Sequence, residues 1–401
     1  MKAKQTRPSV SSKTASLSES VIREMTRLAD KHGALNLAQG FPDFAAPADI
    51  KAAAVKAIQD DYNQYAVTWG SPNLRRAISE KAEWFNGIHS EPDKNVTVTC
   101  GSTEAMMATV MALAEAGDEV IIFEPSYENY TPSTVFAGAT PRPVPMGPDF
   151  GLDEEALKSA FSTRTKLVIV NTPHNPSGKV LTIDELRVIG DLCEDYGSVA
   201  VTDEIYEHIL YDGRKHVSLA SLGSMAERTV TISGVSKTYT ATGWRVGYTI
   251  APAHLTDAIR KVHDYMTVCA PAPMQEASAY ALRLPKSFYA DLAKSYQQKR
   301  DLISAGLKEI GFEFFMPEGA YYILADFARL SALDDKKFAY SMTTDCGVAV
   351  VPGSSFFSGG KKGRTKVRFS YSKKDSTLKE AVAKMSRFFS GKPSRASARS
   401  R

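Results

Sequence analysis

Short apolar runs recur between residues 96 and 251 and are separated by longer amphipathic stretches. The runs are rich in Val, Ile and Thr, as is typical of strands that are buried on both faces of a sheet. They lie at Val96–Thr99, Glu119–Phe123, Leu167–Val170, Val199–Thr202, Thr229–Ile232 and Tyr248–Ala251. Helical patterns such as Thr182–Tyr196 lie between several of them. This alternation predicts an α/β fold with a mostly parallel sheet flanked by helices.

A long helical pattern from about Pro285 to Ile310 predicts the connection to a second, smaller unit. Beyond it, four short strand-like runs stand beside two helical patterns, which indicates an α+β domain. The runs are Glu313–Phe315, Ala320–Ala325, Val348–Val351 and Lys366–Ser370. We therefore expect a disordered arm over 1–18, an N-terminal segment over 19–50 that packs on the small domain, a large domain over 51–295, a small domain over 296–390 and a basic disordered tail over 391–401.

Composition changes this picture little. A chain of 401 residues is long enough for two domains and a large core, and a net charge of +4 is small. Much of the positive charge lies at the two ends without interleaved aromatic residues, so we do not expect nucleic-acid binding. No apolar run reaches membrane-spanning length and no signal-peptide core is present, which argues against a membrane protein. An organelle transit peptide is a minor alternative for the acid-free start of the chain.

The cysteines and histidines show no ligand spacing. Cys100, Cys193, Cys269 and Cys346 are unpaired in their spacing, and the seven histidines are scattered. We read the cysteines as reduced thiols and expect no metal site and a cytoplasmic location.

Polar residues follow the predicted strands. Gly101, Asn171, Asp203 and Lys237 all come just after an apolar run, and ligands gather beyond the carboxyl ends of parallel strands. Burial lowers the pKa of a lysine and frees its amine as a nucleophile, so Lys237 is a candidate for a Schiff base. A single lysine in a turn is ordinarily a surface residue. Because Gly101, Asn171 and Asp203 also follow apolar runs, we favour a binding site that includes Lys237.

Five motifs, one of which contains that lysine, follow one another in a definite order. They are Gly101-Ser102-Thr103-Glu104, Asn171–Gly178, Asp203-Glu204-Ile205-Tyr206, Ser233–Tyr239 and Gly243–Tyr248. With them the chain resembles the class I pyridoxal-phosphate aminotransferases of fold type I, from about Leu35 to Phe389. The resemblance implies pyridoxal 5'-phosphate as cofactor and a homodimer with shared active sites.

The resemblance also implies roles around the cofactor ring. Asp203 matches the carboxylate that keeps the pyridine nitrogen protonated, although a residue after a strand is also a common helix N-cap. Asn175 and Tyr206 match the groups that bind the phenolic oxygen. Tyr127 matches the aromatic platform for the ring face. Lys237 matches the residue that carries the cofactor and then moves the substrate proton.

The phosphate needs unpaired donors and positive potential. Gly101, Ser102 and Thr103 stand at a predicted helix start, and Arg245 adds a charged fork. The family often has a phosphate-binding serine three residues before the lysine, where this chain has Gly234. Either Ser236 or Ser233 binds the phosphate in place of that serine, or the phosphate lacks this contact. Tyr65 matches a tyrosine that reaches the phosphate of the neighbouring subunit.

Arg368 matches the arginine that clamps the substrate α-carboxylate, and Gly40 matches a loop that closes over it. The alternative for Arg368 is a solvated strand residue. The resemblance implies transfer of an amino group from an L-amino acid to a 2-oxo acid, with 2-oxoglutarate as the expected acceptor, by a ping-pong mechanism. No arginine occurs in Val268–Pro273, where one subgroup reads a distal carboxylate. This favours apolar, aromatic or broad donors, with aspartate still open.

Two other functions remain open at this point. The same residues serve β-elimination of cysteine conjugates or ring closure of a methionine derivative. A regulator that only senses the cofactor is remote, because the residues before Gly40 are too few and too polar for a winged-helix module. The sequence leaves undecided the preferred donor, the balance of transamination and elimination, any role of the basic termini, and whether Gly234 weakens phosphate binding.

Overall fold

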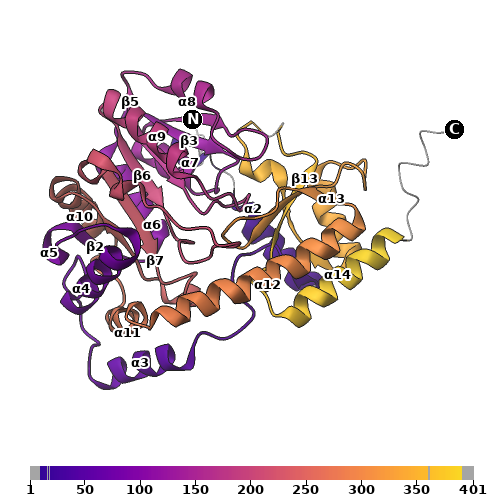
Figure 1. Ribbon diagram of the computed structural model, residues 1–401, viewed down its shortest axis with the longest axis horizontal. Coiled ribbons are helices and arrows are strands. Elements are labelled where there is room, and N and C mark those ends of the chain that lie inside the picture. Colours follow the sequence, from indigo (N-terminus) through magenta and orange to yellow (C-terminus); the bar gives the residue numbers. More distant parts are fainter. Residues whose placement is uncertain (1–9, 16, 18, 360–361, 391–401) are drawn as a thin grey trace, which may run out of the picture.

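Seven strands form the main sheet of the computed structural model, which describes residues 10–15, 17, 19–359 and 362–390 (Figure 1). All strands are parallel except β8, which runs antiparallel to both its neighbours. The order across the sheet is β2 (Val96–Thr99), β8 (Gly247–Ile250), β7 (Thr229–Gly234), β6 (Val199–Asp203), β5 (Thr165–Asn171), β3 (Glu119–Glu124) and β4 (Thr140–Pro145). The predicted mostly parallel sheet is confirmed.

Helices cover both faces of this sheet, which explains the uninterrupted apolar runs. On β5, Leu167 and Ile169 pack in one cluster with α6 (Ser102–Leu113) and α10 (Ala253–Thr267). Val168 and Val170, which point the other way, pack with α9 (Ile183–Asp195). A capping box of Thr182 and Glu185 starts α9, so the predicted helix begins where its sequence indicates.

Strand β4 is absent from the sequence-based prediction. Its sequence carries Pro141, Pro143 and Pro145, and proline cannot donate to a strand ladder. The structure places β4 at the edge of the sheet, paired only with β3, where one side of the strand needs no partner.

A smaller antiparallel sheet forms the second unit, in the order β12 (Val351–Pro352), β13 (Lys366–Ser370), β10 (Tyr322–Asp326) and β9 (Glu313–Phe314). Its core contains apolar residues of α12 (Lys286–Ile310), α13 (Asp335–Ser341) and α14 (Asp375–Ser390). The predicted run Val348–Val351 is divided between β11 (Val348–Ala349) and β12. The long helix α12 runs along both units (Figure 1).

The N-terminal segment joins this second unit. Met25 and Ala29 of α2 (Val21–His32) lie in the same apolar core, and β1 (Leu35–Asn36) pairs in parallel with β11. Leu35 is the register partner of Val348, so residues far apart in sequence are held side by side. The domain boundaries themselves stay predictions.

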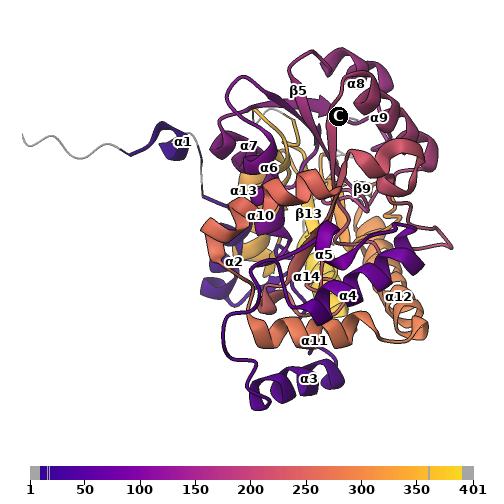
Figure 2. The same ribbon diagram turned by 90° about the vertical axis from the view of Figure 1, so that its left-hand side faces the viewer.

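The remaining helices surround these two units. They are α1 (Ser12–Ala15), α3 (Ala48–Gln59), α4 (Pro72–Lys81), α5 (Pro92–Asn95), α7 (Tyr130–Ala137), α8 (Glu154–Ala160) and α11 (Ala272–Leu282), with short 3-10 or π turns at 82–86, 219–221, 223–227, 242–244, 342–346 and 353–356. Figure 2 shows α3 beneath α11 at one end of the molecule.

The predicted disordered arm and tail fall largely outside the described residues. Residues 1–9, 16, 18 and 391–401 are not described. Within the arm, Ser12–Ala15 form one helical turn, where the sequence predicted none, and Lys13 Nζ donates to the Phe136 carbonyl at 2.7 Å. None of the described helices is long and apolar enough to cross a membrane.

Candidate active site

A cavity of about 430 Å³ opens at the carboxyl edge of the main sheet. Most of the residues predicted for the site line it, although they come from distant parts of the chain. These are Gly40, Ser102, Thr103, Tyr127, Asn175, Asp203, Tyr206, Ser236, Lys237, Arg245 and Arg368. Gly101 and Tyr65 are not among the lining residues.

Asp203 ends β6 and is buried in the cavity floor. Tyr130 Oη donates to its Oδ2 at 2.8 Å, and the Ile205 amide donates to its Oδ1 at 3.3 Å. Burial raises the pKa of the Asp203 carboxyl, although the bond from Tyr130 acts in the opposite direction. Residues 205–208 form turns, so Asp203 does not cap a helix. A cation placed beside a buried carboxylate of this kind would stabilise its ionised form.

Asn171, the register partner of Asp203 on β5, holds two neighbours in place. Its Nδ2 donates to the Asp203 carbonyl at 2.8 Å, and its Oδ1 accepts from the Asn175 amide at 2.8 Å. The strand ladder therefore fixes the position of Asn175 relative to Asp203.

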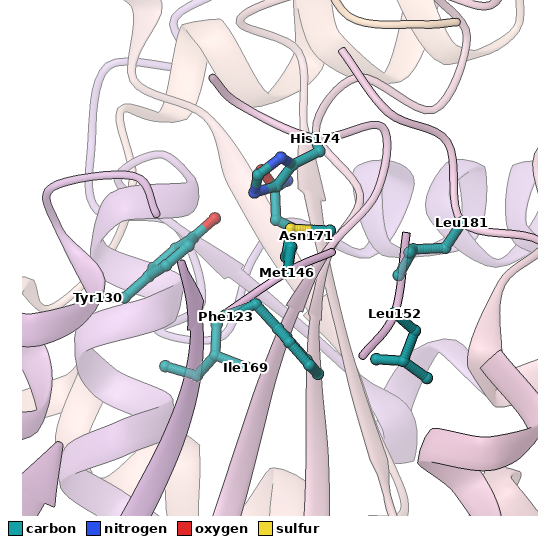
Figure 3. A pocket seen from close by; sticks show the side chains of 8 residues that line it. All are labelled: Phe123, Tyr130, Met146, Leu152, Ile169, Asn171, His174 and Leu181. Atoms are coloured by element: carbon teal, nitrogen blue, oxygen red, sulfur yellow. The ribbon is translucent and has the colours of Figure 1, made fainter. Parts of the chain in front are cut away.

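Tyr130 and Asn171 also line a second, much smaller void (Figure 3). His174 lies near Asn171 in this view, and apolar side chains such as Phe123, Leu152 and Leu181 form the rest of the lining. The void measures about 10 Å³. A cavity needs roughly 10–15 Å³ to hold one water molecule, so this space cannot be a substrate site.

Lys237 follows β7 and reaches into the main cavity. Its side chain is half-buried, and Nζ lies 3.4 Å from the Gly40 carbonyl and 5.8 Å from the centre of the Tyr206 ring. Tyr206 Oη and Tyr322 Oη share a hydrogen bond of 2.9 Å. Of the lysines in the described part of the chain, only Lys237 lines this cavity.

Two glycines allow the close packing at the start of α6. A Cβ on Gly101 would lie 2.3 Å from Arg245 Nη2, and one on Gly247 would lie 2.4 Å from the Ser102 amide nitrogen. Gly101 has a φ of 82°, and Arg245 has a φ of 55° that turns it toward the helix start. The result is a hollow with hydroxyls, free helix N–H groups and a guanidinium, which suits a phosphate.

The structure explains Gly234. A Cβ at this position would come within 2.8 Å of the Val246 carbonyl oxygen and 2.9 Å of the Gly247 Cα. A serine therefore does not fit without backbone movement. Ser233 Oγ instead donates to Glu207 at 2.7 Å, whereas Ser236 lines the cavity. Of the two substitutes considered from sequence, Ser236 is the one available to a phosphate.

Arg368 is 1% exposed and lies on β13, on the side of the cavity formed by the small unit. Its Nη1 donates to Asn175 Oδ1 at 2.9 Å and its Nη2 to the Ala38 carbonyl at 2.6 Å, while Nε has no partner among the described residues. Its guanidinium lies 4.3 Å from the Tyr322 ring centre. No carboxylate of the described residues pairs with it, so an anionic ligand would relieve a buried, uncompensated charge.

Tyr65 lies elsewhere. Its side chain is 84% exposed and lines a separate surface hollow with Tyr62 and Arg76. It therefore has no role in the cavity of its own subunit. None of Val268–Pro273 lines the cavity either.

Several lining residues were missed in the sequence. Tyr130 and Tyr322 bond to Asp203 and Tyr206, and Ser20, Arg23 and Glu128 lie at the N-terminal side of the cavity. Glu128 stands next to the predicted Tyr127, which was the only available signal. The others carry no local pattern that separates them from packing or surface residues.

A buried polar cluster lies beside the site and contains the potential metal ligands Glu204, Glu207 and His216. Lys81 Nζ lies 2.5 Å from Glu207, and Asn86 donates to both glutamates. Burial alone would raise the pKa of Glu207, but the Lys81 ammonium holds it at about 2. The Lys81 ammonium therefore already balances the charge of Glu207 without a metal ion. The cluster links Lys81 of α4, the glutamates that follow β6, and Ser233 of β7.

The residues of the main cavity fit pyridoxal phosphate. The glycine-lined hollow suits its phosphate, Asp203 suits a protonated ring nitrogen, and Lys237 suits its aldehyde carbon. The fold and this site define a pyridoxal-phosphate-dependent enzyme of fold type I.

Comparison with known proteins gives the family. The pattern of the aminotransferase class I and II family matches residues 32–385. The chain is 40% identical to the probable N-succinyldiaminopimelate aminotransferase of Mycobacterium tuberculosis, over 91% of this chain and 95% of that protein. It is 37% identical to the methionine aminotransferase of Escherichia coli, over 93% and 97% of the two chains.

Comparison with solved structures, and one further sequence comparison, indicate the same family. The solved structure of the M. tuberculosis enzyme superposes with a TM-score of 0.92 and 39% identity, covering 94% of this chain and 99% of that one. The human kynurenine–oxoglutarate transaminase 3 is 36% identical, over 91% of this chain and 87% of that protein. The chain belongs to the class I and II aminotransferases and is an aminotransferase.

Proposed function

We propose that this aminotransferase moves the amino group of an L-amino acid to 2-oxoglutarate by a ping-pong mechanism, and that it accepts apolar, aromatic and other donors broadly. The observation that carries the proposal is the buried Arg368, which has no carboxylate partner in the described part of the chain and shares a cavity with Lys237. The similarity to enzymes named for different donors supports breadth rather than one substrate.

Each cavity residue then has a task. When bound, pyridoxal phosphate withdraws electrons from the donor Cα and so makes its proton acidic. Arg245 and the hydroxyls of Ser102, Thr103 and Ser236 would hold the phosphate. Asp203 would hold a proton on the ring nitrogen, and Asn175 and Tyr206 would bind the phenolic oxygen.

The substrate side uses other groups. Arg368 would orient the α-carboxylate with its planar fork, and Gly40 would bring its loop over the same group. Lys237 Nζ would take the Cα proton and return it to the cofactor. Tyr127, beside Tyr130 in an edge-to-face contact at 5.7 Å, would cover the ring and exclude water.

A panel of amino donors with 2-oxoglutarate tests this function. We expect methionine, phenylalanine, kynurenine and glutamine to be converted at least comparably with aspartate, read as the 2-oxo acid product. Arg368→Lys keeps the charge but loses the fork, so KM should rise by about tenfold or more for every donor together. A strong preference for aspartate over all the others would contradict the proposed breadth.

A β-lyase is the second candidate on the same residues. It would release pyruvate and ammonia from a cysteine conjugate without any amino acceptor. Omission of 2-oxoglutarate from the assay separates the two activities.

We also propose that the active unit is a homodimer with shared sites. Tyr65 is 84% exposed, and exposed apolar side chains lie near it in the chain at Tyr62, Val67 and Trp69. Tyr62, Tyr65 and Val67 line one surface hollow, and exposed apolar side chains gathered on one surface favour an interface. The cytoplasmic location and the domain boundaries stay predictions.

Hybrid dimers test the shared site. Lys237→Ala chains and Tyr65→Ala chains should each be nearly inactive, whereas an equal mixture should recover about a quarter of wild-type activity, because half of the dimers are hybrids with one intact site. Co-expression of differently tagged chains also allows isolation of the hybrid, which should show about half of the wild-type rate because one of its two sites is intact. An active monomer in sedimentation would contradict the proposal.

A further inference from the structure

The loop of residues 38–43 forms one edge of the main cavity without being part of any helix or strand. Gln39, Gly40 and Phe41 line the cavity from this loop, and the proposed function gives Gly40 the task of covering the substrate α-carboxylate. A backbone segment outside regular structure needs other partners for its polar groups. Here the loop carbonyls accept hydrogen bonds from side chains.

Two of these side chains belong to the reaction itself. Arg368 Nη2 donates to the Ala38 carbonyl at 2.6 Å, and Lys237 Nζ lies 3.4 Å from the Gly40 carbonyl. In the proposed function Arg368 binds the α-carboxylate and Lys237 carries the cofactor, so the ligands compete with the loop for the same donors. Neither contact can hold the loop throughout the reaction.

Lys373 makes a contact with the loop for which the ligands do not compete. It is 2% exposed and is absent from the cavity lining. Its Nζ donates to the Phe41 carbonyl at 2.7 Å and lies 4.4 Å from the centre of the Phe41 ring. A buried amine that meets both a carbonyl oxygen and an aromatic face restrains that residue at two points. A neutral donor acts beside it, because Tyr321 Oη donates to the Gly40 carbonyl at 2.8 Å.

The residues after Lys373 bind the far end of the same loop. The Lys374 amide donates to Asp43 Oδ1 at 2.6 Å, and Thr377 Oγ1 donates to Asp43 Oδ2 at 2.6 Å. Thr377 belongs to α14, which packs through Leu378 into the core of the small unit. The stretch 373–377 therefore ties the loop to the small unit, which also carries Arg368.

We propose that Lys373 is a positioning residue, which keeps the backbone of Gly40 and Phe41 over the α-carboxylate while Arg368 and Lys237 are engaged by substrate and cofactor. This inference rests on the proposed function and adds a residue that acts on the substrate through the loop. Every donor and 2-oxoglutarate carry the same α-carboxylate. Loss of the contact therefore weakens all of them by the same factor, whatever their side chains.

Lys373→Met tests this role, because methionine keeps most of the length and the apolar contacts of lysine but cannot donate. We expect KM for methionine, phenylalanine and 2-oxoglutarate to rise together by about tenfold, with kcat within about twofold of wild type. Lys373→Arg keeps a charged donor and should recover most of the loss. Calorimetric titration with 3-phenylpropanoate gives a second readout without turnover. This ligand has the carboxylate but no amino group, and its dissociation constant should also rise about tenfold for Lys373→Met.

Lys374→Met is the matched control. It makes the same substitution at the next residue, whose side chain is exposed, and it keeps the backbone amide that binds Asp43. All of these constants should stay within about twofold of wild type. If Lys373→Met does not fold, Thr377→Val tests the same anchor through Asp43. It removes one hydrogen bond, so the same constants should rise by about threefold.

Three results would overturn the inference and leave the aminotransferase function intact. They are unchanged binding of 3-phenylpropanoate in the folded variants, a fall in kcat at constant KM, and weakening that differs strongly between methionine and phenylalanine. Absence of turnover by the wild-type enzyme with every donor would instead overturn the proposed function, and this inference with it.

Discussion

Replacement of Lys237 by alanine should abolish both the covalent link to pyridoxal phosphate and turnover. Lys237 alone among the lysines of the described chain lines the cavity, and its Nζ lies within 3.4 Å of the Gly40 carbonyl, on the loop proposed to close over the substrate. Loss of a positioned proton-transfer group by itself costs about 100- to 10,000-fold, and loss of the nucleophile adds to this. Borohydride reduction followed by peptide mass spectrometry detects the link, and the donor half-reaction measures the rate.

Lys373 is the appropriate control. Burial lowers the pKa of Lys373 to about 8, so its amine is the other candidate for a reactive lysine near this loop. It donates to the Phe41 carbonyl at 2.7 Å, however, and is not among the cavity-lining residues. Lys373→Ala should therefore keep the reducible link at residue 237. A link that survives in Lys237→Ala would refute the assignment of Lys237.

Asp203→Asn should leave cofactor binding in place but lower the rate of the donor half-reaction by about a thousandfold or more, which corresponds to about 4 kcal/mol of barrier. Asparagine Oδ1 can still accept from the Ile205 amide, and its Nδ2 can donate to Tyr130 Oη, so the local structure should persist. It cannot hold a proton on the ring nitrogen, because it carries no negative charge.

The apoenzyme provides an independent readout of the same carboxylate. Because burial raises the folded-state pKa of Asp203, its ionised form costs folding free energy at neutral pH, and the stability it contributes is present at low pH and lost as pH rises through that pKa. Asp203→Asn should therefore not lower the melting temperature of the apoenzyme at neutral pH. Tyr130→Phe, which removes only one hydrogen bond to Asp203, should slow the reaction far less. A near-normal rate for Asp203→Asn would show that Asp203 has no role in the reaction and only stabilises the turn at 205–208.

The residues at the strand ends show how much of the fold and site could be predicted from the sequence. Apolar runs buried on both faces identify parallel strands, and parallel strands bring their carboxyl ends together, so the sequence predicts that Asp203 and Lys237 share one site. The sequence did not predict β4, because three of its six residues are prolines. Prolines are tolerated in an edge strand, but which strand lies at the edge depends on how the strands pair. Likewise, nothing local to Gly234 shows that the Val246 carbonyl excludes a side chain there.

The sequence by itself determined the α/β architecture, the aminotransferase family and about half of the cavity lining, because strand periodicity and the motifs at strand ends are local. Tertiary structure alone decided the N-terminal side of the cavity. In sequence, Arg23 and Arg27 are equivalent polar positions of one amphipathic helix. Pairing of Leu35 with Val348 sets α2 against the small unit, and only then does Arg23 face the cavity. Which surface of a helix adjoins a cavity depends on contacts distant in sequence, and no local pattern records them.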